Sequence, residues 1–583
     1  MPVRIGLLTE GGYPYVSGDA RLWCDRLVRG LGQHEFDIYA LSRSERQESE
    51  GWLELPPQVS RVRTAPLWSA EDDGVVHGRR ARRRFGECYE ELAAVLCAGD
   101  GQASDTAVTG PTELPAAASA DVADRFANAL YGLAELARDE GGLVTALRSE
   151  RAVRALERAC RAPGALRTAR EARVPELLTV AAHLERALRP LSLDWYEDDA
   201  LGSVDLCHAT AGGTAALPGL LARHFAGVPL LVTEYGVQLR THYLASADAP
   251  PAVRALLGAF HSRLAAEIYR RAALITPGNS HTRRWQERCG ADRTKIRTVY
   301  PGMEASRFAE VGEEADRADA DTLVWVGRIE PAKDLISLLH AFAEIRKEEP
   351  KARLRIVGAA SGAEGEAYLG HCRALAAQLF PDEAEGVHAV GDNPVSFEEI
   401  GGPEAPTLAE AYAAGTVIVL SSVVEGFPIG LVEAMFCGRA TVSTDVGAVV
   451  EVIGGTGLVV PPRNPRALAE ACVSLLRDPE RRERLGAAAR ARALELFTIE
   501  QNITAFHGIY LEIVSHSPIH RVVLDDAGDP LPFAAPAEGH VPGRWTGPRT
   551  GPTARVVARG GPRWAAGAPV RATTPLPATE AAR

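Results

Sequence analysis

Arg328 and Lys333 lie in a short segment that directly follows an apolar run, Thr322–Val326, typical of a buried strand. The segment opens a predicted helix. A guanidinium and an ammonium at such a place can bind one anionic group, the first as a planar fork and the second as a point charge. The chain has four lysines, so composition alone does not account for Lys333. The alternative is a solvated cationic turn.

A second segment, from Ser421 to Met435, also follows an apolar run and enters a helix. Gly426 lets the backbone turn, and Gly430 lets it come close to a ligand. The free N–H groups of the first helical turn can bind phosphate or sugar oxygens. Glu425 precedes the turn and Glu433 lies early in the helix, where two carboxylates join this potential ligand site. The alternative is a loop with a capping glutamate.

Parallel sheets must position both segments. Residues 1–308 alternate apolar runs with helical patterns, which predicts a Rossmann-like domain, with a helical insertion at about 75–200. The small, polar stretch 98–121 inside the insertion reads as a loop. The strands expected in this domain are 4–8, 36–41, 204–208, 228–234, 273–276 and 297–300.

A second βα series is expected at 322–495, after an acidic linker at 309–321. Its strands are mostly apolar throughout and do not alternate, which indicates a sheet covered on both faces. Two such domains form a cleft at the carboxyl ends of their sheets, a natural ligand site. A closing helix (496–514) and a disordered tail (515–583) follow. The expected strands are 322–326, 353–357, 387–390, 416–420, 440–443 and 458–460.

Composition excludes several classes of function. The 583 residues carry a net charge of -12, which disfavours nucleic-acid binding through a positive field. No apolar run is long enough to span a bilayer, and the start has no secretory pattern, so we expect a cytoplasmic protein. The nine cysteines are scattered and read as reduced, buried thiols. Asp319-Ala320-Asp321 lies in the acidic linker, and we do not expect it to bind metal.

As a set, these segments resemble the retaining glycosyltransferases of family 4, which have the GT-B architecture. The likeness rests on the E-x7-E pattern from Glu425 to Glu433 and on Gly327-Arg328 with Lys333. Stretches 299–303, 433–438 and 444–447 also look like that family. The stretches 8–16 and 233–237, with the helical insertion, are similar to the branch that contains the cytosolic glycosyltransferase of Pel exopolysaccharide synthesis.

The resemblance implies sugar transfer from a nucleotide-sugar, and UDP-glucose is the first candidate donor. Transfer would retain the anomeric configuration and would need no metal or other cofactor. Arg328 and Lys333 would hold the diphosphate and stabilise the leaving group, which needs compensating charge. Glu433 would bind the ribose, and Glu425 the donor sugar. The acceptor would be a glycan or a small molecule, and a membrane complex for polysaccharide synthesis is an expected partner. The other implied donor contacts are Gly18, Phe427, Pro428, Ile429, Gly430 and Leu431.

Two departures from the family pattern keep a rival function open. Asp19 stands where the branch usually has a second glycine, and Tyr235, a candidate catalytic position, stands where it usually has histidine. Tyrosine can donate one hydrogen bond but cannot carry positive charge. The rivals are a nucleotide-sugar-binding subunit with weak or no catalysis, and a sugar-nucleotide epimerase. Candidates for the acceptor side are Tyr13, His208, Arg240 and His242, although His208 could equally be a structural histidine.

Overall fold

The computed structural model describes residues 2–18, 20–70, 73–98, 116–197, 199–313, 319–381 and 393–517. The chain has two compact units. The first comprises residues 1–232, 246–274 and those from Phe506 on, and the second comprises 233–245 and 275–505. Asp19, the expected strand 387–390 and the expected tail beyond residue 517 lie outside the described residues.

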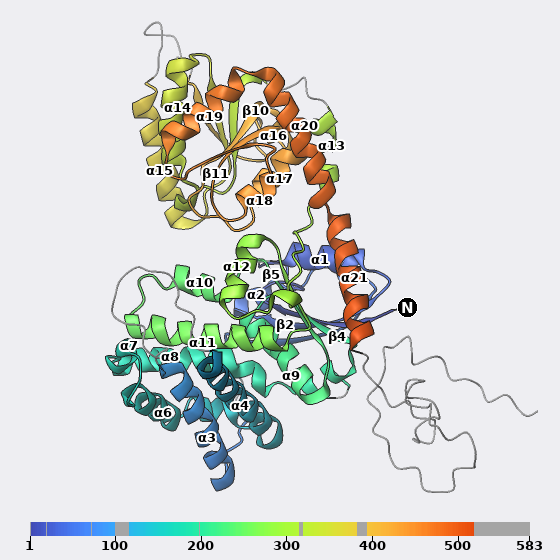
Figure 1. Cartoon of the computed structure of the whole chain (residues 1–583), viewed down its shortest axis with the longest axis vertical. Coiled ribbons are helices and arrows are strands. Elements are labelled where there is room, and N and C mark those ends of the chain that lie inside the picture. The colour runs from blue at the N-terminus through green and yellow to red at the C-terminus, as the bar shows by residue number, and fades with distance from the viewer. Residues whose placement is uncertain are drawn as a thin grey trace, which may run out of the picture. The chain divides into compact units, whose positions relative to one another are not determined.

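A six-stranded parallel sheet forms the first unit, as the βα rhythm predicted (Figure 1). The boundary between the units falls within β5 and β6, so the carboxyl ends of these strands belong to the second unit. The strand order is β3 (Val59–Pro66), β2 (Glu35–Ser42), β1 (Arg4–Glu10), β4 (Leu206–Ala209), β5 (Leu230–Glu234) and β6 (Leu274–Pro277).

Helices connect these strands and pack on the sheet. The C-terminal half of α21 also belongs to the first unit, where Phe506 and Tyr510 are buried. In the described part of the chain, no helix is long and apolar enough to cross a bilayer. The first unit's helices outside the insertion are α1 (Arg21–Gly30), α2 (Glu45–Ser49), α9 (Leu217–Ala226), α11 (Pro251–Arg271) and the C-terminal half of α21 (Ile499–His516). α10 (Gln238–Ala245) and α12 (Ser280–Arg288) belong to the second unit.

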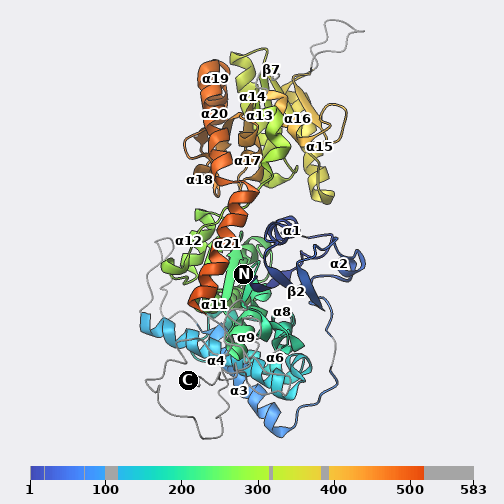
Figure 2. The same cartoon turned by 90° about the vertical axis from the view of Figure 1, so that its right-hand side faces the viewer.

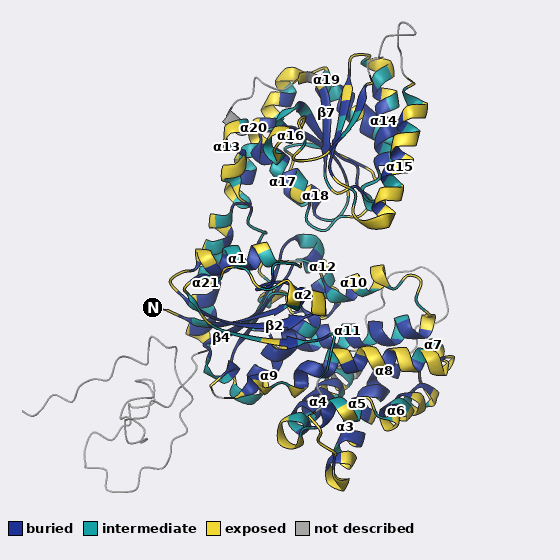
Figure 3. Cartoon of the chain, turned by 180° about the vertical axis from the view of Figure 1, so that it is seen from behind, coloured by how far each residue is buried: buried dark blue, intermediate teal, exposed yellow. Residues whose placement is uncertain are grey.

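The predicted helical insertion lies between β3 and β4 and forms a group of helices within the first unit (Figure 2). Its inward faces are buried and its outward faces are exposed, as expected for amphipathic helices (Figure 3). The helices are α3 (Arg79–Cys97), α4 (Ala116–Glu140), α5 (Leu143–Leu147), α6 (Glu150–Arg161), α7 (Arg167–Arg170) and α8 (Val174–Leu188).

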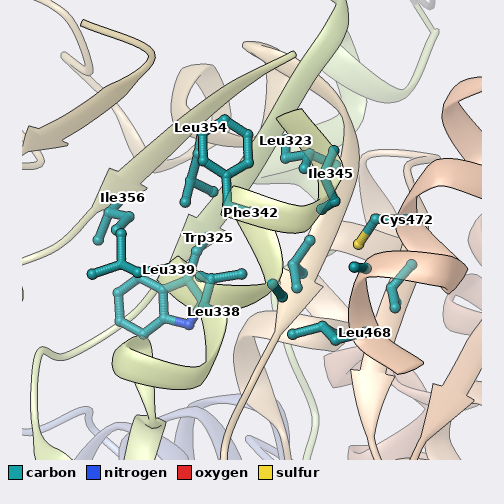
Figure 4. Close-up of a cluster of buried hydrophobic side chains, with 14 of the residues drawn as sticks. Leu323, Trp325, Leu338, Leu339, Phe342, Ile345, Leu354, Ile356, Leu468 and Cys472 are labelled. Carbon is teal, nitrogen blue, oxygen red and sulfur yellow. The ribbon is translucent and has the colours of Figure 1, made fainter. Parts of the chain in front are cut away.

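The second unit contains the other parallel sheet, also of six strands. On one face, Trp325 and Leu354 pack against Leu338, Leu339 and Phe342 of α14 (Figure 4). A second buried cluster covers the opposite face. The sheet is therefore covered on both sides, as its mostly apolar strands predicted. The strand order is β12 (Leu458–Val460), β11 (Ala440–Thr444), β10 (Gly415–Leu420), β7 (Asp319–Val326), β8 (Arg353–Val357) and β9 (Val395–Glu398).

Two sequence predictions about elements are wrong. Segment 297–300 is not a strand, although Arg297 N and Val299 N donate to the backbone oxygens of Ile275 and Pro277 beside it. Pro277 has no N–H to donate, which stops a ladder there. The predicted linker 309–321 contains α13 (Ala309–Glu313) and the start of β7. The other helices here are α14 (Leu335–Glu348), α15 (Gly362–Leu379), α16 (Leu408–Ala413), α17 (Ile429–Phe436), α18 (Val449–Ile453), α19 (Pro465–Leu476) and α20 (Pro479–Leu496).

Candidate functional site

The loops that follow β7 and β10 lie together in the second unit. β7 and β10 are neighbours in the parallel sheet, so their carboxyl ends share one edge. Backbone and side-chain hydrogen bonds join the two loops. Val423 N donates to the carbonyl oxygen of Ala332 over 2.9 Å. The hydroxyl of Ser421 donates to the carbonyl oxygen of Lys333 over 2.7 Å. The two chemically interesting segments therefore form one structural feature.

Lys333 and Glu425 form an ion pair across these loops. The ammonium of Lys333 contacts Oε1 of Glu425, and the hydroxyl of Ser422 donates to the same oxygen over 2.8 Å. The two side chains are 17% and 10% exposed, so solvent screens the pair only partly. A charge that is buried in this way requires an oppositely charged partner, and Lys333 and Glu425 are each other's partner. The structure thus brings together two residues that the sequence singled out separately.

Arg328 lies on the same β7 loop and is exposed. Within the described residues, its guanidinium makes no hydrogen bond or ion pair. The backbone beneath it is tightly packed: Gly327 N donates to Val357 O over 3.1 Å, and a Cβ at Gly358 would lie 1.8 Å from Gly327 O. A fixed backbone therefore carries a cation that remains available to bind an anion.

The helix predicted to begin near Ile429 is α17, and it begins at that residue. Its N-cap is Pro428, which makes no side-chain capping hydrogen bond. Ile429 is exposed, whereas Leu431 is buried in the second unit. A Cβ at Gly426 would meet no atom within 4 Å. The loop before α17 therefore borders open space at Gly426, where sugar or phosphate oxygens can approach the backbone. Ile429 N and Leu431 N, at the start of the helix, already donate to Phe427 O and Pro428 O.

Glu433 lies in α17 and is anchored from the side. Its Oε2 accepts a hydrogen bond of 2.9 Å from the hydroxyl of Tyr412, a buried residue of α16. Burial raises the pKa of Glu433, while this hydrogen bond and the positive charge of Arg307 oppose the rise. A carboxylate held in one orientation can accept hydrogen bonds from a ligand's hydroxyl groups without first losing side-chain freedom.

A third loop, after β11, supports the Glu425 segment. The hydroxyl of Thr444 donates to Ser422 O over 2.6 Å, and Ala448 N donates to Gly426 O over 3.1 Å. Gly447 has φ +58°, and a Cβ there would lie 2.5 Å from Glu425 O. The sequence marked 444–447 only as part of a family pattern, and its supporting role was missed. A glycine three residues after the end of a strand was the available signal.

Gly18 and Tyr13 lie in the β1–α1 loop of the first unit. Gly18 has φ +111°, and a Cβ there would lie 1.8 Å from the carbonyl oxygen of Gly11. Only glycine fits this close contact. The Tyr13 side chain is fully buried, and its pKa is raised mainly by burial and secondly by Asp25. Tyr13 is therefore a buried residue of the first unit, and its assignment to the acceptor side stays a prediction.

His208 is also a buried residue of the first unit, as in the structural alternative that the sequence left open. The imidazole is fully buried, its Nδ1 lies 2.7 Å from the hydroxyl of Tyr510, and Phe506 and Trp23 pack around it. Burial lowers the pKa of His208 to about 3, so the ring is neutral at neutral pH. The sequence placed it correctly at the end of a strand but could not show that α21 covers it.

Tyr235, Arg240 and His242 belong to the second unit. The Tyr235 ring lies against Gly278, where a Cβ would come within 2.3 Å of it. Thr282 donates from its hydroxyl to Tyr235 O over 3.3 Å. Arg240 and His242 are partly exposed residues of α10. Tyr235 is thus held in place by Gly278 and by Thr282 of α12, and α10 supplies basic groups.

Sequence reasoning missed a basic face of α12. His281, Arg284 and Arg288 follow one another at helical spacing, so they share one side of the helix. The pKa of His281 is lowered first by burial and then by Arg240, Arg284 and Arg288, which places all four groups near one another. The spacing of basic residues from 281 to 288 was the available sequence signal.

Comparisons with known proteins match the two halves of the chain separately. Residues 3–294 match the family model described as a domain of unknown function, DUF3492, and residues 320–478 match the model described as glycosyl transferases group 1. The D-inositol 3-phosphate glycosyltransferase of Kineococcus radiotolerans is 31% identical over 284 residues, which cover 46% of this chain and 62% of the relative. The chain thus spans about three fifths of that relative.

The enzyme of the same name from Frankia alni is 30% identical over 303 residues, 50% of this chain and 70% of the relative. Among solved structures, the sucrose-phosphate synthase of Thermosynechococcus elongatus superposes with a TM-score of 0.50 at 17% identity. This match covers 88% of the present chain and 100% of the synthase. It confirms the predicted GT-B type of fold. The resemblance to the Pel branch stays a prediction.

Proposed function

Because the chain belongs to the glycosyltransferases of group 1, and by its first half to the DUF3492 family, we propose that it transfers a sugar from a nucleotide-sugar to an acceptor. Transfer proceeds with retention of configuration and without a bound metal. The observation that carries the proposal is the Lys333–Glu425 ion pair, set at one sheet edge beside Arg328 and the start of α17.

Arg328 and Lys333 supply the charge that the reaction requires. When the bond between the anomeric carbon and the phosphate oxygen breaks, its electron pair goes to the departing nucleoside diphosphate. An exposed guanidinium and a partly buried ammonium lie where they can neutralise that charge as it develops. The Lys333 ammonium is already ordered by Glu425, so its side chain loses little conformational freedom when the nucleotide-sugar binds.

Glu425 and Glu433 bind the uncharged parts of the donor. Glu425 accepts hydrogen bonds from hydroxyls of the sugar, together with the backbone from Phe427 to Leu431. Glu433, held by Tyr412, accepts hydrogen bonds from the ribose. The open space in front of Gly426 supports this arrangement, because a sugar must approach the backbone closely there.

UDP-glucose is the first donor to test, and the acceptor is a glycan chain or a small molecule handled in the cytoplasm. The sequence resemblance to the family 4 enzymes supports this choice. The relatives from Kineococcus and Frankia bear the name of an enzyme that acts on an inositol phosphate, which supports a small-molecule acceptor. Resemblance to the Pel branch supports a glycan acceptor and a membrane complex for polysaccharide synthesis.

A panel of UDP-, GDP- and ADP-sugars tests the proposal on the purified full chain with EDTA present. Thermal stabilisation and release of nucleotide are measured in parallel. We expect one class of nucleotide-sugar to raise the melting temperature and to release nucleotide steadily once glycan or small-molecule acceptors are added. If none of the donors stabilises the protein, the assignment of the donor site is wrong.

A nucleotide-sugar-binding subunit without turnover is the second candidate function. Tyr235 favours it, because this side chain is fixed against Gly278 at a position where the resembled branch has histidine. A phenol donates one hydrogen bond but carries no positive charge at neutral pH. Stabilisation by a donor with no nucleotide release, whatever acceptor is supplied, would favour this function over catalysis.

A further inference from the structure

Cys97 and Cys160 hold their sulfur atoms 3.4 Å apart inside the helical insertion. Cys97 is the last residue of α3, and Cys160 lies in the last turn of α6. Both side chains are buried, with 1% and 0% of their surface exposed. The separation exceeds a disulfide bond, which is about 2.0 Å long, by roughly 1.4 Å. Small rotations of two side chains close a gap of this size.

The backbone around this pair is fixed on both sides. Leu166 N donates to Cys97 O over 2.8 Å, and Ala98 forms an isolated antiparallel bridge with Ala165. These contacts tie the end of α3 to the chain that leaves α6. The two cysteines therefore do not meet by chance side-chain rotation, because the segments that carry them are held together independently of the sulfurs.

Their electrostatic environment also distinguishes the two thiols from each other. The two thiols share one hydrogen bond, in which either sulfur can be the donor. With Cys97 as the donor, this bond lowers the pKa of Cys160 against the effect of burial, and the neighbouring Arg161 lowers it further. The same contact raises the pKa of Cys97. Buried cysteines without such a partner behave differently: burial raises the pKa of Cys472 to about 12. Cys160 is thus the thiol of this pair that ionises more readily, and the thiolate is the reactive form.

We propose that Cys97 and Cys160 form a reversible disulfide when the protein meets a peroxide. The Cys160 thiolate attacks the O–O bond, giving a sulfenic acid and, after protonation, water. The Cys97 sulfur then attacks the Cys160 sulfur, forming the S–S bond and releasing the sulfenic oxygen as a second water. Overall, two thiols and one hydrogen peroxide give one disulfide and two waters. A dithiol reductant returns both thiols.

The bond would act on the helical insertion alone. It closes a loop between positions 63 residues apart in the chain, and it joins α3 to α6. Cross-links of long loops reduce the conformational freedom of the unfolded chain, so oxidation should raise the melting temperature by several degrees. The residues proposed to bind the nucleotide-sugar lie in other elements. The disulfide proposal therefore does not depend on the proposed transferase activity.

In the test, the native full chain is treated with stoichiometric hydrogen peroxide and the excess peroxide is removed. The protein is then denatured and its free thiols are counted. Wild-type protein starts with nine thiols and should fall to seven. Cys97→Ser and Cys160→Ser should each start with eight and lose none as a disulfide. The matched control, Cys472→Ser, changes another buried cysteine and should still lose two. Peptide mapping should find Cys97 linked to Cys160, and dithiothreitol should reverse the link.

Three results would overturn the proposal. The first is that Cys97 and Cys160 both remain free thiols at peroxide levels that oxidise the half-buried Cys88. The second is sulfinic or sulfonic acid at Cys160 in place of a link. The third is a disulfide that joins a different pair. Because the peptide map is made on wild-type protein, it decides the matter even if a serine variant fails to fold.

Discussion

The ammonium of Lys333 pairs with the carboxylate of Glu425, although 92 positions separate them in the chain. Both side chains are largely shielded from solvent. Each residue lies in the loop that follows its own strand, and the adjacency of β7 and β10 makes the contact possible. In such a pair, removal of either partner leaves an uncompensated, partly buried charge. The two residues therefore cannot be treated as independent contributors to a donor site.

Lys333→Ala and Glu425→Ala should each lower kcat/KM for transfer by about 100-fold or more, because each removes a group that contacts the donor as charge develops. The fold should persist in both variants. Steady-state kinetics with circular dichroism checks this. The matched control is Lys347→Ala, which breaks an exposed ion pair with Glu344 in the same unit and should leave transfer unchanged. Wild-type turnover in either site variant would defeat the assigned roles.

Gly447→Ala should impair transfer through the backbone of Glu425. A Cβ at this position would lie 2.5 Å from Glu425 O, so the loop must shift, and the residue also has a positive φ. Gly455→Ala is the control, since Gly455 has φ +87° but no atom within 4 Å of a Cβ. Both variants should lose about 1 kcal/mol of stability from backbone strain. Only Gly447→Ala should lose activity, measured as a fall in kcat/KM. Equal losses in both would show that strain alone is responsible.

The rule that parallel strands carry ligand sites at their carboxyl ends was enough to single out the segments of Lys333 and Glu425, but the contact between the two side chains was not predicted. The βα rhythm also gave β8 and β12 with their bounds, although Arg353 in β8 and Val459 in β12 are exposed. β3 was missed, since its arginines and threonine interrupt the apolar pattern of an edge strand. β9 was missed as well, and the strand expected nearby lies outside the described residues.

His208 and Tyr13 show what a local pattern cannot supply. A polar residue at the end of a strand can face a ligand or lie in the core, and the outcome depends on what packs over it. For His208 the covering residues come from α21, 302 positions later in the chain. For Tyr13 the neighbouring groups come from α1. Neither packing arrangement follows from the spacing of residues within the loop.

Tyr235→His should raise the rate of transfer if residue 235 lies beside the reacting sugar, because imidazole can carry a proton and a positive charge where phenol cannot. The ring contact with Gly278 sets the available space, and histidine is the smaller ring. Tyr235→Phe is the control: it keeps the ring and removes the hydroxyl, and it should not raise the rate. The measurement is kcat with a saturating donor. A lower rate in the histidine variant would show that Tyr235 is not a degraded catalytic position.

Acid should destabilise the first unit through His208 and His34. Burial lowers the pKa of His208 to about 3 and that of His34, mainly by burial and secondly beside His507, to about 4. In an unfolded chain histidine titrates near 6.5. The unfolded state therefore binds more protons between these values, so the stabilisation from neutral histidines is complete above about pH 6.5 and falls as pH drops toward 4 and then 3.

Each such histidine adds a slope of up to about 1.4 kcal/mol per pH unit within that window. Chemical denaturation followed at several pH values between 7 and 4 measures the slope. His208→Gln should flatten it, because glutamine can accept the hydrogen bond from Tyr510 but does not titrate. The exposed His371→Gln is the control and should leave the slope as in wild type. An unchanged slope in His208→Gln would mean that His208 of the wild-type protein becomes exposed to solvent before global unfolding. Local detachment of α21 is the most direct route to that exposure. Faster hydrogen exchange at the Tyr510 amide would detect it.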